Sequence, residues 1–340
     1  MNSYLLPREG RVRVEGALSD VMLLVDMVFQ GTVLGPSLWN SFFGDVATEV
    51  PVGRQEINLF ADDLTVMTSV PQASSSALLN ETLEEAQIRT HRWGVKNQVQ
   101  FDPSKEYFKI LHPSLGSGED FKLLGTLIDC KLTMQPCIEN VLGKIRPKIR
   151  ALLRLQHLYS PATMLDQYKS HIWSSKEYSN GALIMAAPHQ LRRLDKVQRW
   201  YLHELALTDT GAFTMFNFAP PSLRRAIGML GFIHKRTLGI CHPLLLQALP
   251  FAVGLDANYN TKALDPFSGG VHYHGRLYER SLYMYILIYN RLPQVLVDLP
   301  SVAVFQAKLT HLAKHKALVH PDNWRSSFQS TADVADMSYS

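Results

Sequence analysis

The stretch from Ile57 to Met67 constrains the fold most, because two adjacent carboxylates interrupt an alternation of apolar residues. The alternating positions are Ile57, Leu59 and Ala61 before the acids, and Leu64 and Val66 after them. A period of two predicts two short strands that meet in a tight turn, with Asp62 and Asp63 at the tip. Carboxylate oxygens there can bind a hard cation such as Mg²⁺, with phosphate completing the coordination shell. The alternative is a solvated acidic turn, because two-residue motifs recur by chance.

A glycine-rich loop precedes this predicted hairpin. Its residues are Gln30, Gly31, Thr32, Val33, Leu34, Gly35 and Pro36. A backbone that carries so little side chain lets a large ligand approach closely. The segment 37–43 can begin a helix, and Pro36 suits the first turn of that helix.

In this order, the two motifs resemble the palm domain of reverse transcriptases (RNA-directed DNA polymerases) of non-LTR retrotransposons. Members of that family carry a Q-G-[ST]-x-L-G-P loop, followed at about this separation by an aromatic-Ala-Asp-Asp hairpin. The resemblance implies that Asp62 and Asp63 are catalytic acids that bind Mg²⁺, or alternatively Mn²⁺. The residues implied to contact nucleotide or template are Gln30, Gly31, Leu34, Gly35 and Pro36. The implied partners are an RNA template, a DNA primer and deoxynucleoside triphosphates.

Two later segments also match landmarks of the family. The segment Val99 to Lys105 resembles a short strand that ends in F-[DN]-x-x-K, which implies that Lys105 lies near the active site. A solvated lysine on a turn is the alternative. The segment Phe121 to Asp129 resembles the [YF]-L-G hairpin that holds the primer end, which implies that Leu124 and Gly125 form a primer grip. The alternative is an edge hairpin whose glycine allows a bulge.

Helical periodicity dominates after Cys130. Val141 to Leu155 and Gln190 to Leu207 carry Lys and Arg at helical spacing. From Val141 to Arg236 the chain has fifteen Lys or Arg against five Asp or Glu, although the net charge of the whole chain is only +4. A local excess of this size suits a surface that grips phosphate backbones. Ordinary solvated helix faces are the alternative.

We therefore predict an α+β fold with four regions. These are a partial polymerase palm over 1–130, a basic helical thumb and connection over 131–236, a helical C-terminal region over 237–321, and a polar, disordered tail over 322–340. The three cysteines form no C-x-x-C pair, which fits a reducing compartment without a disulfide framework or a zinc finger. The longest apolar run, near 238–255, is interrupted by His, Pro and Gln, so it predicts buried helices rather than a membrane span.

The family's third carboxylate has no counterpart in this sequence. Two-metal phosphoryl transfer needs two clamped ions, and in the family a further acid, at the end of a Phe-Asp motif, lies on a neighbouring strand upstream. Asp20 and Asp26 are the aspartates before the loop, and neither fits that position. The fingers region is also missing. We expect an N-terminally truncated and defective copy, because the residues of such a site act as a unit.

Three functions remain open at this point. The first is RNA-directed DNA synthesis, active or decayed. The second is a non-catalytic remnant that binds RNA or an RNA–DNA hybrid, and its binding should fall steeply with salt. The third is a marginally folded chain without a cellular role, whose exposed sheet edge promotes aggregation. No membrane contact and no protein partner is predicted.

Overall fold

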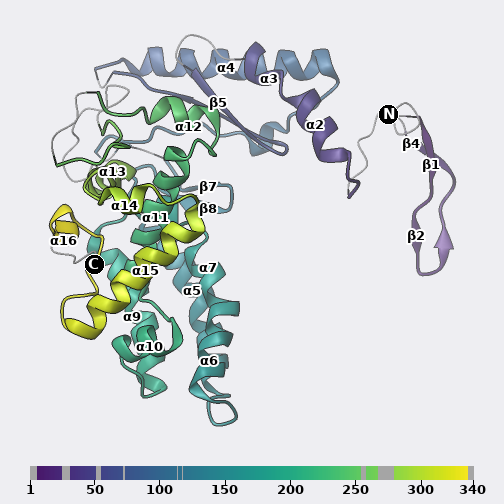
Figure 1. The fold of residues 1–340 in the computed structure, drawn as a ribbon. Helices are drawn as coiled ribbons and strands as arrows, with labels where there is room; N and C mark the ends of the chain where they lie inside the picture. The colour runs from purple at the N-terminus through teal and green to yellow at the C-terminus, as the bar shows by residue number, and fades with distance from the viewer. Residues whose placement is uncertain are drawn as a thin grey trace. The chain divides into compact units, whose positions relative to one another are not determined.

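The computed structural model describes residues 6–24, 31–50, 55–71, 73–112, 114–116, 118–253, 258–266 and 279–335. The chain divides into two compact units, Met1–Phe108 and Lys109–Ser340. In Figure 1 the first unit runs from purple to blue and the second from blue through teal to yellow.

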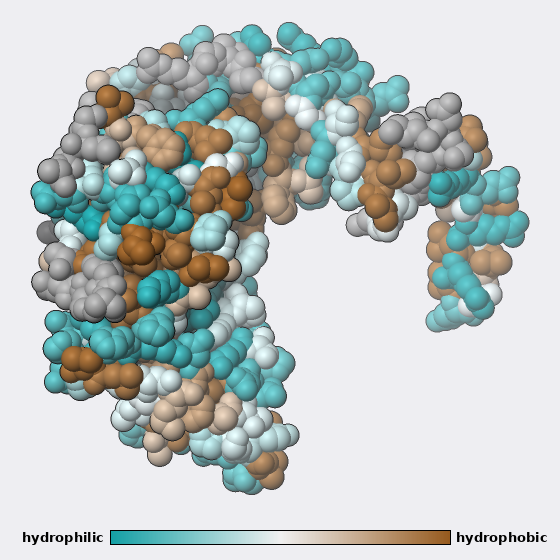
Figure 2. Space-filling model, in the orientation of Figure 1, coloured by the Kyte–Doolittle hydropathy of each residue, from teal (hydrophilic) through white to brown (hydrophobic). Residues whose placement is uncertain are grey.

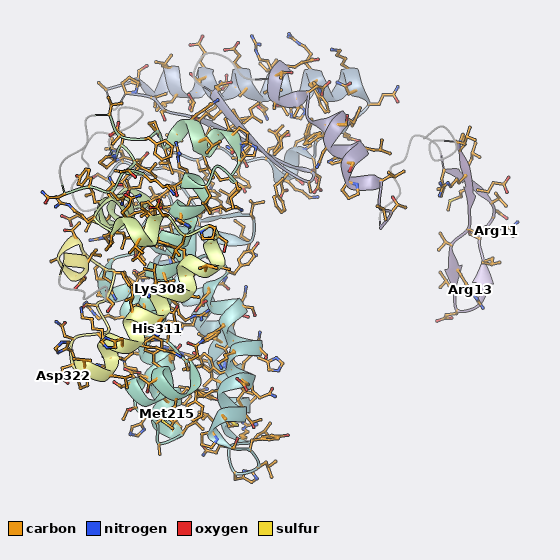
Figure 3. The ribbon with its side chains drawn as sticks, in the orientation of Figure 1. Arg11, Arg13, Met215, Lys308, His311 and Asp322 are labelled. Carbon is orange, nitrogen blue, oxygen red and sulfur yellow. The ribbon has the colours of Figure 1, made fainter. Side chains whose placement is uncertain are left out.

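The first unit begins with nested antiparallel strand pairs. The strands are β1 (Arg8–Gly10), β2 (Arg13–Val14), β3 (Ala17–Leu18) and β4 (Met22–Leu24). β1 pairs with β4, and β2 pairs with β3. Glu15 and Gly16 join β2 to β3 with φ angles of 49° and 90°. Positive φ at both central residues is what a type I′ turn requires. The side chains of Arg11 and Arg13 on this hairpin are exposed (Figure 3).

The rest of the first unit packs helices against a second hairpin. Its elements are α2 (Gly35–Phe43), α3 (Val46–Glu49), β5 (Gln55–Phe60), β6 (Asp63–Thr68), α4 (Ser76–Asn97) and the 3₁₀ turn η1 (Pro103–Lys105). The buried core consists of Phe43, Val46, Val50 and Trp93, with partly buried hairpin side chains packed against it. The indole N–H of Trp93 donates a 2.9 Å hydrogen bond to Asp45 Oδ1, which ties α4 to the start of α3.

The second unit opens with a short hairpin followed by helices. The elements are β7 (Phe121–Leu123), β8 (Thr126–Ile128), α5 (Gln135–Leu153), α6 (Pro161–Tyr168), the π-helical turn η2 (Lys169–Trp173), α7 (Ser174–Glu177), α8 (Asn180–Leu183), α9 (Pro188–Glu204) and α10 (Asp209–Phe216). The Asp129 carboxylate accepts hydrogen bonds from the backbone N–H groups of Thr133 and Met134, just before α5. Ile138, Ile145 and Ile149 recur at helical spacing and are fully buried, so they give α5 its core face.

A second helical layer completes this unit. It contains α11 (Pro221–Thr237), α12 (Pro243–Ala248), α13 (Leu282–Asn290), α14 (Gln294–Val297), α15 (Val302–Val319) and α16 (Thr331–Ala335). The His234 ring on α11 stacks on Phe305 of α15 with 4.2 Å between ring centroids. Its two nitrogens lie 2.9 Å from the Tyr289 hydroxyl and 3.0 Å from the Leu299 carbonyl oxygen. One buried histidine thus connects three helices of the core.

Two of the predicted boundaries differ from the structure. The hairpin 121–128, predicted to belong to the first domain, lies in the second unit, because β8 packs on α5. The tail predicted to be disordered from residue 322 is ordered through 335. Trp324, Phe328 and Val334 are buried in the core, and Trp324 stacks on Phe213 at 5.0 Å. Three apolar side chains in a polar segment are enough to anchor it.

The predicted α+β class is confirmed: helices dominate, and the strands of the described residues form four two-stranded antiparallel sheets. None of the described helices combines the length and the apolar character that a membrane crossing requires. On the face shown in Figure 2, hydrophobic side chains are interspersed with hydrophilic ones along the second unit.

Candidate active site

The acid-bearing hairpin has the predicted form of two strands and a tight turn, but the turn lies one residue earlier than predicted, because Asp63 already pairs with Phe60 as the first residue of β6. Leu59 lies opposite Leu64, and Ile57 lies opposite Val66. Because paired residues of antiparallel strands point to the same side, these four form the face that packs on the core. Phe60 pairs with Asp63 on the opposite face, where Phe60 is 64% exposed.

The turn itself is Ala61–Asp62, and a helix of the same unit holds it. Ala61 adopts a φ of 54°, which a residue with a Cβ atom rarely takes. The indole N–H of Trp39 on α2 donates a 2.8 Å hydrogen bond to the Ala61 carbonyl oxygen. The Trp39 ring stacks on buried Phe43 at 5.1 Å, so its position is fixed by the core.

Asp62 and Asp63 are both exposed at this tip. Neither carboxylate has a hydrogen bond or an ion pair to the residues that the structure describes. Their oxygens are therefore open to a ligand, and adjacent carboxylates fit the oxygen preference of Mg²⁺ or Mn²⁺. Within the described ranges, no cluster of three or more His, Cys, Asp or Glu forms a candidate metal site, so no third acid joins the pair.

The glycine-rich loop leads directly into the helix that contacts the turn. Gly31 has a φ of 83° and is exposed, and a Cβ placed there would meet no atom within 4 Å. Gly35 is the buried first residue of α2, and Pro36 follows in its first turn. Gly35 and Trp39 are about one helical turn apart on α2, so the loop and the residue that bonds the Ala61–Asp62 turn belong to the same helix end. Val33 is 94% exposed and Leu34 is 43% exposed. Gln30 lies outside the described residues.

Lys105 ends the 3₁₀ turn η1. Its side chain is 83% exposed, and Nζ lies 3.6 Å from Asp102 Oδ2. The pKa of Asp102 is lowered, first by hydrogen bonds from the Ser104 hydroxyl and amide and to a smaller degree by Lys105. Phe101, four residues earlier, packs against the same core as the acid hairpin. The structure thus makes Lys105 an exposed cation with a weak local partner.

Leu124 and Gly125 form the turn between β7 and β8 in the second unit. Their φ angles are 47° and 79°, again the signs of a type I′ turn. The Tyr178 hydroxyl donates a 2.9 Å hydrogen bond to the Leu124 carbonyl oxygen. The Thr126 and Ser179 hydroxyls lie 2.8 Å apart. Sequence reasoning missed the two anchoring residues, because more than fifty positions separate them from the turn and no motif marks them.

The cations of the second unit gather on the outer faces of two helices. On α5 the exposed members are Lys144, Arg146, Lys148, Arg150 and Arg154, the last being the residue that caps the helix. Among these, only Lys148 bonds to another side chain of the described residues: its Nζ donates a 3.2 Å hydrogen bond to Ser175 Oγ. On α9, Arg192, Lys196 and Arg199 form one exposed stripe at spacings of four and three. Both faces carry positive charge that no described acid neutralises.

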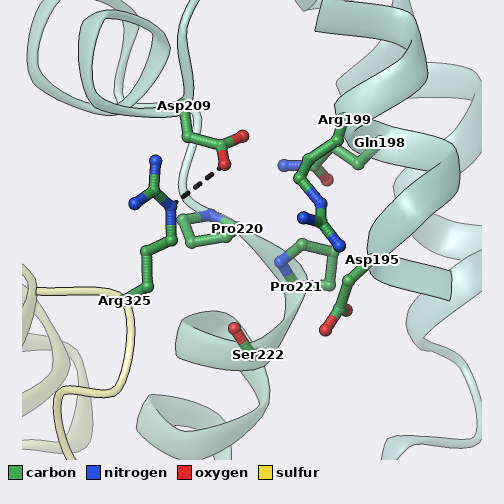
Figure 4. Close-up of a pocket in the computed structure, with 8 residues that line it drawn as sticks. All are labelled: Asp195, Gln198, Arg199, Asp209, Pro220, Pro221, Ser222 and Arg325. Carbon is green, nitrogen blue, oxygen red and sulfur yellow. Dashed lines mark hydrogen bonds and ion pairs between the residues drawn. The ribbon is translucent and has the colours of Figure 1, made fainter. Parts of the chain in front are cut away.

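Several other charges of this unit are paired. A cavity of about 160 Å³ is lined partly by Asp195, Asp209, Arg199 and Arg325 (Figure 4). Asp209 Oδ2 forms a 3.1 Å ion pair with Arg325 Nε, and Asp195 Oδ1 forms one of 3.1 Å with a terminal guanidinium nitrogen of Arg225. Both carboxylates of the cavity are therefore already neutralised, which disfavours it as a metal site.

Lys176 is the most deeply buried cation of the chain's described part. Its Nζ donates a 3.1 Å hydrogen bond to Gln198 Oε1. Desolvation lowers the pKa of Lys176 to about 7, although Asp195 and Glu177 oppose that shift. Glu177 is held by Arg224 through two 2.6 Å hydrogen bonds. These contacts join α7, α9 and α11, and no sequence pattern predicted them.

Comparison with known proteins agrees with the resemblance drawn from the motifs. No family model matches the chain, and no solved structure matches it. The RNA-directed DNA polymerase from mobile element jockey of Drosophila melanogaster is 28% identical over 183 residues, which cover 49% of this chain and 19% of that protein. The jockey protein of Drosophila funebris is 25% identical over 227 residues, covering 61% of this chain and 24% of that protein.

The chain spans about a fifth to a quarter of the length of the curated relatives it matches. Both relatives are RNA-directed DNA polymerases, the class of protein that the glycine-rich loop and the Asp-Asp hairpin indicated. Over 49% to 61% of its length, the chain is thus similar to the RNA-directed DNA polymerases from mobile element jockey.

Proposed function

We propose that the first unit is part of a reverse transcriptase palm in which Asp62 and Asp63 bind Mg²⁺ or Mn²⁺. The observation that carries this proposal is the turn itself. Two adjacent carboxylates are exposed, have no partner among the described residues, and stand on a hairpin held by the helix that follows the glycine-rich loop.

The other site residues receive roles in the same proposal. Gly31, Leu34, Gly35 and Pro36, with Gln30, contact nucleotide or template, and the open space at Gly31 allows a close approach. Lys105 supplies a positive charge to a phosphate. Leu124 and Gly125 hold the primer end, and Tyr178 keeps their turn in place. Asp62 and Asp63 would hold the metal ions, which would supply activation of the primer 3′ oxygen and charge stabilisation of the leaving oxygen of a deoxynucleoside triphosphate.

We further propose that Asp62 and Asp63 supply two of the three carboxylates of the family motif. Asp20 lies in the segment between β3 and β4 and is not proposed as the third. A chain with these two carboxylates alone would be defective in templated synthesis, because removal of one member of a catalytic unit costs most of the rate.

The second candidate function is binding of RNA or an RNA–DNA hybrid without chemistry. The exposed cations on α5 and α9 favour it, because Lys and Arg without acidic partners are free to neutralise phosphates. The two candidates share this surface and differ in whether the acid pair contributes.

Primer extension tests the first candidate. The purified chain is given an RNA template with an annealed DNA primer, deoxynucleoside triphosphates and Mg²⁺ or Mn²⁺. We expect slow incorporation that Asp62→Asn or Asp63→Asn abolishes and that Asp20→Asn, at an exposed acid outside the proposed site, leaves unchanged. Incorporation that survives Asp63→Asn would place the activity elsewhere.

The salt dependence of binding tests the second candidate. The triple variant Lys144→Gln, Arg150→Gln and Arg154→Gln is compared with a matched variant on α15 that changes Lys308, Lys314 and Lys316 to Gln; Lys308 is labelled in Figure 3. We expect the α5 variant to reduce the slope of log K against log salt by about 2 to 3 units, since each phosphate contact contributes about 0.7 to 0.9. Equal slopes for the two variants would remove α5 from the interface.

A further inference from the structure

The hydrogen bond from Trp39 acts on the peptide group that leads into Asp62. The acceptor is the Ala61 carbonyl oxygen, 2.8 Å from the indole nitrogen. This carbonyl belongs to the planar peptide unit that joins Ala61 to Asp62, so the bond fixes the orientation of that whole plane. The directions in which the Asp62 and Asp63 side chains leave the turn depend on the same plane.

The turn needs such a constraint. Ala61 has a φ of 54°, a conformation in which its Cβ is crowded. The central peptide of a two-residue turn can flip, which interconverts turn types. Alanine at this position therefore destabilises the observed turn conformation relative to the flipped one. The hydrogen bond from Trp39 stabilises the observed conformation.

The Trp39 ring is itself held in place. It stacks on Phe43 with ring centroids 5.1 Å apart and an interplanar angle of 20°, and it contacts Phe42 at 5.9 Å. Phe43 is only 2% exposed and belongs to the core of the first unit. A rigid ring delivers its N–H in a fixed direction, so the core positions the turn through one bond.

We propose that Trp39 is a positioning residue that holds the Ala61–Asp62 peptide and thereby presents the Asp62 and Asp63 carboxylates to a divalent metal ion, an inference that rests on the proposed metal-binding function. Trp39 does not touch the metal. It selects the turn conformation in which both carboxylates are available, and metal affinity falls by the factor by which that conformation is depopulated.

The chain provides a matched control in Trp93. The Trp93 ring also packs on Phe43, at 5.5 Å, and its indole N–H also donates one hydrogen bond, of 2.9 Å, to Asp45. Trp93→Phe and Trp39→Phe thus remove one indole hydrogen bond each from the same aromatic cluster. Only Trp39→Phe removes a bond to the acid turn.

The experiment measures Mn²⁺ affinity by electron paramagnetic resonance and the amide signals of protein labelled with ¹⁵N-aspartate. We expect Trp39→Phe to weaken Mn²⁺ binding about threefold to tenfold, the value of one hydrogen bond, and to broaden or shift the Asp62 and Asp63 signals. We expect Trp93→Phe to change the affinity less than about twofold. Adding Ala61→Gly to Trp39→Phe should restore most of the affinity, because glycine takes positive φ without crowding.

Equal losses of affinity in Trp39→Phe and Trp93→Phe, or no rescue by Ala61→Gly, would overturn the positioning role. Unchanged affinity in Trp39→Phe would do the same. If wild type and Asp63→Asn bind Mn²⁺ alike, the proposed metal site fails. The aspartate signals still decide the positioning role in that case, since Trp39 controls the turn only if Trp39→Phe perturbs them and Trp93→Phe does not.

Discussion

The two units of the chain differ in how much buried core supports their charged groups. The first unit has a core of four buried hydrophobic residues and presents Asp62 and Asp63, exposed, on a two-stranded hairpin. The second unit has two clusters of nineteen and twenty-three buried residues, and it buries Lys176 and Arg225 beside acids. A small core keeps the acids accessible but leaves their geometry dependent on few contacts. A large core stabilises its unit enough to offset the desolvation free energy of buried charged groups.

The largest expected contrast comes from core truncation. Phe43→Ala should cost about 3 to 5 kcal/mol and Ile145→Ala about 2 to 5 kcal/mol, because both side chains are almost fully buried. We expect the first unit to lose its fold in Phe43→Ala, since Trp39 and Trp93 both pack on that ring. The second unit should stay folded in Ile145→Ala, with reduced stability.

Hydrogen exchange read peptide by peptide measures this contrast. In Phe43→Ala, segment 55–68 should exchange at nearly unprotected rates while helices α5 and α9 keep their protection. If both units lose protection together in either variant, they fold as one cooperative body, and the contrast between them is wrong.

A second prediction concerns pH and the buried lysine. The pKa of Lys176 is about 7 in the folded unit, against an ordinary value of 10.5. Between these values the unfolded chain holds a proton that the folded chain lacks, so stability rises with pH by about 1.4 kcal/mol per unit. From pH 7 to 9 we expect a gain of roughly 2 to 3 kcal/mol in the second unit.

Urea unfolding at the two pH values measures this gain. Lys176→Met should remove it, whereas Lys148→Met, at an exposed position, should not. The pKa of His234 is lowered below 6.5 by burial, so its contribution changes at more acidic pH and lies outside this window. A gain that persists in Lys176→Met would assign the pH dependence to another group.

The smallest expected effect is a stabilisation of the first unit. Gln98 follows α4 with a φ of 58°, and its backbone N–H bonds the Gly94 and Val95 carbonyl oxygens. Gln98→Gly should raise the stability of this unit by up to about 1 kcal/mol, because glycine takes this conformation without crowding. Thermal unfolding of the variant and wild type measures the shift. A loss of stability would show that the Gln98 side chain contributes more than its strained backbone costs.

Local patterns predicted the elements of this molecule better than its boundaries. The alternation around Asp62 and Asp63 predicted the hairpin, and helical spacing predicted α5 and α9, because each depends on neighbours in the sequence. Trp39 and Tyr178, which hold the two turns, could not be predicted. Their bonds to Ala61 and Leu124 span 22 and 54 residues, and the acceptors are backbone carbonyl groups that any residue carries.

Segments at the edges of the predicted regions show the same dependence on distant partners. Composition made residues 322–340 look disordered, yet Trp324 finds a stacking partner in Phe213, more than a hundred positions away. The hairpin at 121–128 was assigned to the first domain by family order, whereas its turn is bonded to Tyr178 of the second unit. In each case a distant partner decides where a short segment belongs.

The most direct test of the account is where Mn²⁺ binds on the chain. In protein labelled with ¹⁵N-aspartate, Mn²⁺ added below one equivalent broadens the amide signals of the aspartates nearest to it. The account predicts that Asp62 and Asp63 broaden first, and that Asp62→Asn together with Asp63→Asn abolishes this site. Broadening that begins at Asp20 or at the aspartates of the second unit, with Asp62 and Asp63 unaffected, would contradict it.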